Sequence, residues 1–175
     1  MSQNKLVSVT INAYNCEKYI ADTLTSVINK SYKNLQIIVI DDASTDNTAE
    51  IIKGFADPRI ELYSLEKNGH ISNAINEGYR RVKGEYMVHI DSDDIMAPDL
   101  VEKTIEFLEN NPEYGAVFHR PTIIDQNSND VRDEFLENVF NTTAKTQADF
   151  VRLFFESSNH LLHPGSTMRK SVMDD

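Results

Sequence analysis

The chain has 175 residues, of which 40% are hydrophobic and 26% charged, and this composition is typical of a globular domain with a buried core. Its 17 basic and 28 acidic residues give a net charge of −11, which argues against a nucleic-acid backbone as the partner. Cys16 is the only cysteine, which excludes an intramolecular disulfide and a zinc cluster. No signal-peptide core or membrane-length apolar run is present, so we expect a cytoplasmic protein.

The first half of the chain alternates predicted strands with predicted helices. β-branched residues in alternation predict a strand over residues 6–11, and an almost unbroken apolar run predicts a central strand over residues 35–40. A third, shorter strand is predicted over residues 59–64. Apolar residues at helical spacing predict a helix around residues 20–28, and residues 44–46 offer an N-cap for a second helix.

The second half continues the alternation before it becomes less regular. An apolar stripe over residues 71–82 predicts the next helix, and residues 85–90 predict a strand that ends in carboxylates. Pro98 suits the first position of a further helix that reaches Leu108. The remaining predicted elements are a strand over 114–124, a polar surface loop over 125–133, a helix over 146–156 and a strand that starts within 161–168.

This order of elements predicts one α/β domain over residues 1–175. Strands that alternate with helices form βαβ units, and therefore a mostly parallel central sheet with helices on both faces. Ligands of such sheets bind beyond the carboxyl ends of the strands. Three predicted strand ends carry polar side chains, namely residues 12–15, residues 41–42 and residues 91–94. We therefore expect the functional site at this edge of the sheet.

The acidic cluster Asp91-Ser92-Asp93-Asp94 is the most informative of these strand ends. Like charges crowded together repel one another, and a hard cation with oxygen ligands relieves the repulsion. Mg²⁺ or Mn²⁺ takes one or two carboxylates and leaves coordination positions for substrate phosphates. The cluster thus indicates a metal-bound diphosphate. A solvated turn that caps the following helix is the structural alternative.

An ordered set of motifs carries a family resemblance. Residues 7–15, 38–46, 68–76 and 84–94 resemble, in that order, four segments of family 2 glycosyltransferases: the opening strand and loop, the VDDGSTD segment, the Asn-x-Gly stretch, and the block with Gly-Glu-Tyr and Asp-x-Asp-Asp. The resemblance covers roughly the first two-thirds of the chain. It implies the GT-A fold, a Rossmann-like nucleotide-diphospho-sugar transferase fold. It also implies transfer of a sugar from a nucleotide donor, a UDP-sugar, to an acceptor hydroxyl with inversion.

For the nucleobase, the resemblance implies contacts from the first two strand ends. Tyr14 would pack on the uracil face, while Asn12 and Ala13 would line the base through their backbone atoms. Asp42 would accept a hydrogen bond from the uracil ring N–H, which distinguishes uracil from cytosine. A surface role for Tyr14 and a turn-forming role for Asp42 are the corresponding structural alternatives.

For the ribose and the diphosphate, the resemblance points to the third strand end and the helix before it. Asp91 would bind ribose hydroxyls, with Ser92 beside it, and Asp93 would ligate Mn²⁺ or Mg²⁺ between the two phosphates. Gly69 and Asn73 would complete the nucleotide-sugar site, although backbone conformation alone accounts for a glycine and a helix start for an asparagine. His160 or His163 is a further candidate metal ligand, but a lone histidine is more often structural.

Two features depart from the family pattern. Asn12-Ala13 stands where the family usually has Pro-Thr or Pro-Val before the tyrosine. The acidic motif with the general base is expected downstream of Asp175, so no catalytic residue is assigned, and we expect donor binding with little or no transfer. The expected acceptor is a glycan or a lipid-linked glycan, and a longer protein could associate peripherally with a membrane.

Three other functions fit parts of the sequence. A nucleotidyltransferase would have a loop rich in glycine and basic residues after its first strand, but residues 12–18 contain no glycine and no arginine. A receiver-type phosphoacceptor domain would explain Asp41 and Asp42 but would leave the cluster at Asp91 without a role. A non-catalytic nucleotide-sugar-binding module fits the sequence as well as a transferase does.

Overall fold

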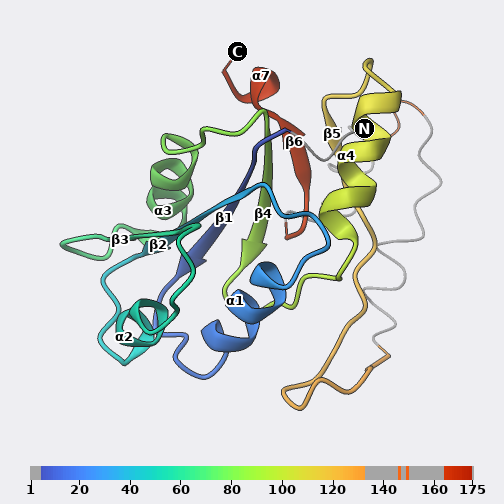
Figure 1. Cartoon of the computed structure of the whole chain (residues 1–175). Helices are drawn as coiled ribbons and strands as arrows, with labels where there is room; N and C mark the ends of the chain where they lie inside the picture. The colour runs from blue at the N-terminus through green and yellow to red at the C-terminus, as the bar shows by residue number, and fades with distance from the viewer. Residues whose placement is uncertain (1–4, 133–145, 147–148, 150–163, 175) are drawn as a thin grey trace. The chain divides into compact units, whose positions relative to one another are not determined.

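The computed structural model describes residues 5–132, 146, 149 and 164–174 (Figure 1). The chain divides into two compact units, one formed by residues 1–117 and 163–175 and the other by residues 118–162. In the described ranges, no helix is both long and apolar enough to cross a membrane. The predicted helix over 146–156 lies almost entirely outside the described residues.

The first unit contains a six-stranded sheet with the order β3-β2-β1-β4-β6-β5. Neighbours among the first four strands are parallel, whereas β6 pairs antiparallel with both β4 and β5. This confirms the predicted mostly parallel sheet, and Figure 1 shows β1 and β4 with their arrowheads at the same end. The strands are β1 (Val7–Ala13), β2 (Leu35–Asp41), β3 (Ile60–Ser64), β4 (Tyr86–Asp91), β5 (Ala116–Val117) and β6 (Thr167–Arg169).

Helices cover both faces of this sheet, as the alternation predicts. The larger core lies between one face and the helices α1 (Ile20–Ile28), α2 (Thr48–Lys53) and α4 (Leu100–Asn110). The smaller core lies between the other face and α3 (His70–Tyr79). Because strand side chains alternate between faces, Ile11 and Ala13 enter the larger core, whereas Thr10 and Asn12 point to the face of α3. A short helix, α7 (Lys170–Met173), follows β6.

The predicted element boundaries differ from the structure in a few places. Helix α2 begins at Thr48 after Asn47, later than the predicted cap, and Asp46 Oδ1 accepts the Thr48 N–H at 3.0 Å. Helix α4 begins at Leu100, two residues after Pro98. The predicted strand over 114–124 is wrong for most of its length, because only the two residues of β5 pair within the sheet.

In the second unit, the described residues include an ordered turn where a polar loop was predicted. Ile124 and Asp130 form an antiparallel bridge. Between them, the Asp125 carboxylate accepts the backbone N–H groups of Asn127 and Asn129 at 2.8 and 3.0 Å. These bonds, led by those from the Asn129 side chain, lower the pKa of Asp125. The turn is therefore organised by one carboxylate, which is a common role for aspartate.

Lys30, directly after α1, is a buried lysine that supports the loop between β4 and α4. Its side chain is 2% exposed, and Nζ donates a hydrogen bond to the carbonyl oxygen of Met96. Burial lowers the pKa of Lys30 from 10.5 to about 8, because the charged form loses hydration. The contact thus holds the loop at the expense of stability at neutral pH.

We expect Lys30→Gln to change how stability depends on pH. Because the pKa of Lys30 is about 8 in the folded state and 10.5 when unfolded, the unfolded chain alone holds this proton between those values. The free energy of unfolding of the parent protein should therefore rise with pH across this window, by about 2–3 kcal/mol more than that of Lys30→Gln. Urea unfolding at pH 7 and pH 10 measures this difference. Exposed Lys33→Gln is the control, and identical pH slopes for Lys30→Gln and the parent would show an ordinary pKa for Lys30.

Candidate functional site

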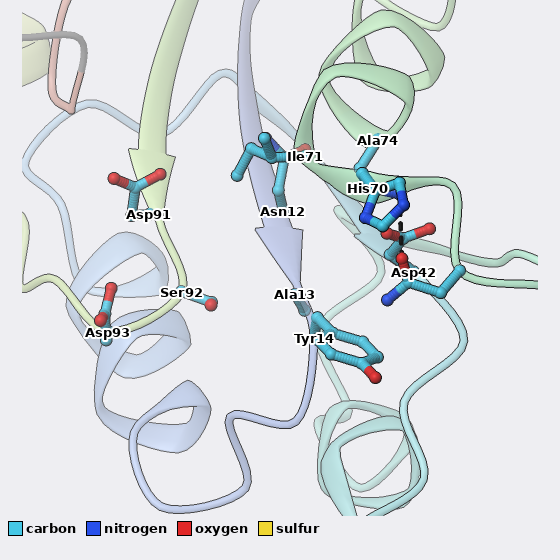
Figure 2. A pocket seen from close by; sticks show the side chains of 11 residues that line it. Asn12, Ala13, Tyr14, Asp42, His70, Ile71, Ala74, Asp91, Ser92 and Asp93 are labelled. Carbon is cyan, nitrogen blue, oxygen red and sulfur yellow. Dashed lines mark hydrogen bonds between the residues drawn. The ribbon is translucent and has the colours of Figure 1, made fainter.

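A pocket of about 330 Å³ opens at the carboxyl edge of β1, β2 and β4 (Figure 2). Of the predicted nucleotide-sugar and metal-site residues that the structure describes, it contains all except Gly69 and Asn73. Figure 2 shows Tyr14 and Asp42 on one side, Asp91 and Asp93 on the other, and Asn12 between them. The lining residues are Asn12, Ala13, Tyr14, Asp42, Asn68, His70, Ile71, Ala74, Asp91, Ser92 and Asp93.

Two large apolar side chains face solvent at the pocket. Tyr14 is 49% exposed at the end of β1, and Ile71 is 61% exposed in the first turn of α3. The expectation that Ile71 belongs to the buried stripe of α3 is wrong, because the helix begins at His70, beside the open edge of the sheet. Exposed apolar surface of this kind suits a planar ring such as a nucleobase.

The two aspartates at the end of β2, Asp41 and Asp42, have different surroundings. Asp42 is buried, lines the pocket and accepts the Gly69 N–H through Oδ1 at 2.8 Å. The side chain of Asp41 instead accepts the Ser44 N–H at 3.0 Å. Ala43, with a φ of 61°, places a left-handed residue immediately after this pair. The turn therefore directs one carboxylate to the pocket and the other to the backbone.

Gly69 and Asn73 lie beside the pocket without lining it. Gly69 is the N-cap residue of α3, and its N–H fixes the position of Asp42. A Cβ atom on Gly69 would lie 2.5 Å from Nδ2 of Asn73, so the two residues are packed closely. Their direct contact with a ligand stays a prediction, whereas their neighbours Asn68, His70 and Ile71 line the pocket. In the sequence, the only indication that Asn68, His70 and Ile71 lie at a binding site is the family resemblance of residues 68–76.

A buried histidine, His89, contacts Asp91, and the sequence predicted no role for it. His89 is 1% exposed; its Nε2 lies 3.1 Å from Asp91 Oδ1 and its Nδ1 lies 3.2 Å from Thr10 Oγ1. An ionised carboxylate only accepts, so Nε2 carries a proton toward Asp91, and the Thr10 hydroxyl contacts the other ring nitrogen, Nδ1. This chain of contacts orients the Asp91 carboxylate.

Helix α1 holds the loop that follows Asp91. The hydroxyl of Thr23 donates to the carbonyl oxygen of Ser92 at 2.9 Å, and the hydroxyl of Ser26 accepts the Met96 N–H at 3.0 Å. Together with the bond from Lys30, these contacts fix both ends of the segment that carries Asp93. The acidic cluster is thus presented by a supported loop, and its rigidity favours binding.

The acidic cluster concentrates negative charge. Burial, with a contribution from the charges of Asp91 and Asp93, raises the pKa of Asp94 from 3.8 to about 6. Within the described ranges, no three His, Cys, Asp or Glu side chains form a ready-made metal centre. The lining carboxylates of Asp91 and Asp93 nevertheless fit a hard cation that keeps most of its coordination for phosphates and water. The candidate ligands His160 and His163 lie outside the described residues.

Comparisons with known proteins agree with this fold. Residues 8–172 match the sequence profile of Glycosyl transferase family 2. A Haemophilus influenzae protein named as an uncharacterized glycosyltransferase is 40% identical over 119 residues, which are 67% of this chain and 37% of that protein. The chain thus spans well under half the length of this relative.

Two solved structures share the fold at low sequence identity. The crystal structure of S. aureus TarS 1-349 in complex with UDP-GlcNAc has a TM-score of 0.73 and 23% identity, over 97% of this chain and 46% of that one. The mannosyltransferase PcManGT from Pyrobaculum calidifontis, in complex with GDP-Man and Mn²⁺, has a TM-score of 0.70 and 19% identity, over 96% and 45%. The predicted GT-A fold is confirmed, and the chain belongs to glycosyl transferase family 2.

Proposed function

We propose that this chain binds the nucleoside diphosphate of a UDP-sugar in the pocket at the carboxyl edge of the sheet. The observation that carries the proposal is the division of the pocket: Tyr14 and Asp42 lie on one side, and Asp91 and Asp93 on the other. A nucleotide sugar has the same division, with an aromatic base at one end and a charged diphosphate at the other. TarS, which shares the fold, has been solved with UDP-GlcNAc.

Asp42 supplies the base selection in this proposal. One of its oxygens accepts the Gly69 N–H, and a carboxylate has about four acceptor positions in all, so acceptor capacity remains for the uracil ring N–H. Cytosine carries no hydrogen at the corresponding nitrogen, so it gains nothing from a carboxylate there. The exposed ring of Tyr14 offers a face for stacking that any base could use.

Asp93 would hold Mn²⁺ or Mg²⁺, and Asp91 would bind the ribose. A bound cation would neutralise charge that develops on the departing nucleoside diphosphate. The mannosyltransferase PcManGT, solved with GDP-Man and Mn²⁺, supports a cation in this fold. An oriented Asp91 and a supported loop at Asp93 would position the donor, and water and other ligands would complete the coordination shell.

We also propose the complete reaction, in which the sugar is transferred from the bound nucleotide to an acceptor. An acceptor hydroxyl, on a glycan or a lipid-linked glycan, would displace the nucleoside diphosphate directly and invert the anomeric centre. We also propose a cytoplasmic location, with peripheral membrane association of a longer protein. A non-catalytic nucleotide-sugar-binding module would have the same pocket, and sugar transfer by a longer protein separates these two possibilities.

Comparison of UDP with CDP tests the base assignment. Asp42→Asn keeps an oxygen for the Gly69 N–H but replaces the other oxygen with an N–H donor. Calorimetric titration in Mn²⁺ should show that the parent protein prefers UDP, and that Asp42→Asn reduces the UDP-over-CDP ratio about tenfold or more. Asp22→Asn, on the exposed side of α1, is the control. An unchanged ratio in Asp42→Asn would remove Asp42 from base recognition.

A further inference from the structure

Asn12 is a buried amide without a hydrogen-bond partner in the described part of the chain. Its side chain is 7% exposed at the end of β1, and neither Oδ1 nor Nδ2 has a hydrogen-bond partner among the residues that the structure describes. It also lines the pocket, in the middle of the view in Figure 2. A buried amide is costly unless something hydrogen-bonds to it, so this side chain is suited to meet a ligand's polar atoms.

The sheet register places Asn12 next to Asp91. The two residues are directly paired across the parallel strands β1 and β4, so their side chains project from the same face of the sheet. On the other side of β1, Asn12 is paired with Ile40, which is apolar. Asp91, the carboxylate that the proposed function assigns to ribose, is therefore a direct polar neighbour of Asn12 in the pocket lining.

The chemistry of the two side chains is complementary toward a hydroxyl group. The Asp91 carboxylate accepts the hydroxyl proton, but it has no hydrogen to give to the hydroxyl oxygen. The Asn12 amide has both a donor and an acceptor, so its N–H can satisfy that oxygen. The contact between His89 and Asp91 keeps the carboxylate oriented while this happens.

We propose that Asn12 and Asp91 together recognise the vicinal 2′,3′-diol of the donor's ribose, and that the Asn12 amide makes the site selective for ribonucleotides over deoxyribonucleotides. The inference rests on the proposed function and adds a side-chain role for Asn12, for which the sequence predicted backbone contacts only. A site built to hydrogen-bond a hydroxyl rejects an analogue that lacks it, because its own buried polar groups are then left unpaired.

The test compares UDP, 2′-deoxy-UDP and 3′-deoxy-UDP by calorimetric titration in the presence of Mn²⁺. The parent protein should bind at least one deoxy analogue about five- to tenfold more weakly than UDP, a factor typical of one buried hydrogen bond. In Asn12→Ala, that discrimination should fall about threefold, to the part that the Asp91 carboxylate supplies, because the donor to the hydroxyl oxygen is gone. Asn76→Ala, the same change at an exposed position of α3 outside the pocket, should retain it.

The thermal unfolding of the ligand-free variants controls for folding. Asn12→Ala removes an amide that has no hydrogen-bond partner among the described residues, so its melting temperature should equal or exceed that of the parent protein. If Asn12→Ala has a lower melting temperature than the parent protein, Asn12→Leu replaces it in the titrations, because leucine is close in size to asparagine.

The outcomes separate this inference from the proposed function. If UDP and both deoxy analogues lose affinity by the same factor in the Asn12 variant, or if none changes, Asn12 does not read the diol and the inference is overturned. If the parent protein fails to bind UDP at all, the proposed function itself fails, and the inference falls with it.

Discussion

Replacement of Asp93 with asparagine is expected to weaken the Mn²⁺-dependent binding of UDP by about 100-fold or more. Asparagine has the shape of aspartate but not its charge, and a hard divalent cation binds an amide oxygen far less strongly than a carboxylate. Calorimetric titration of UDP in Mn²⁺ measures the loss. The melting temperature of the metal-free variant should stay near that of the parent protein, because Asp93 lies at the pocket surface.

Asp99→Asn is the matched control for this loss. Asp99 precedes α4, its carboxylate pairs with Lys103 at 2.6 Å, and it does not line the pocket. Its replacement removes the same charge a few residues away, so a general electrostatic effect would appear in both variants. If Asp93→Asn and Asp99→Asn bind UDP equally well in Mn²⁺, the cation is not held by Asp93.

Replacement of Gly84 with alanine is expected to lower the free energy of unfolding by more than about 3 kcal/mol. A Cβ atom at this position would lie 2.6 Å from the Leu6 carbonyl oxygen, 2.7 Å from the Ser8 nitrogen and 2.9 Å from the Tyr86 carbonyl oxygen. All three are backbone atoms at the start of β1 and β4, so they cannot move aside without disturbing the central strand pair. Urea unfolding of the purified protein measures the change.

Gly78→Ala is the control for this substitution. Gly78 is also buried, on α3, but a Cβ atom there would meet nothing closer than 3.6 Å. Alanine is favoured over glycine in a helix by about 1 kcal/mol, so Gly78→Ala should be neutral or stabilising. Equal stability of Gly84→Ala and the parent protein would mean that β1 and β4 are not packed as closely as the structure has them.

The parallel part of the sheet could be predicted because its signals are local. The apolar run at β2 and the alternation at β1 follow from burial on both faces, and their predicted limits lie close to the observed ones. Strands were expected within 114–124 and from within 161–168, but the antiparallel pairing of β5 with β6 could not be predicted, since it joins residues far apart in sequence and each strand is very short. Local periodicity does not report such long-range pairing.

The site could be located from sequence, but its inner details could not. Because ligands bind at the carboxyl ends of parallel strands, the order of strands and helices is enough to bring residues 12–15, Asp42 and residues 91–94 together. The roles of His89 and Ile71 at the site could not be predicted, because His89 lies within an apolar strand and Ile71 within the apolar stripe of a helix. Periodicity does not report which end of an element is open to solvent. That the Asn12 amide lacks a hydrogen-bond partner among the described residues follows only from the three-dimensional arrangement of its neighbours.

The most direct test of the proposed function is calorimetric titration of UDP into the parent protein in Mn²⁺ and, separately, in EDTA. The pocket predicts a single UDP site whose affinity falls strongly when the cation is removed, since the carboxylates of Asp91 and Asp93 would otherwise repel the diphosphate. Absence of UDP binding in Mn²⁺, together with absence of binding by GDP and thymidine diphosphate, would contradict a nucleotide-sugar site and leave only the family fold.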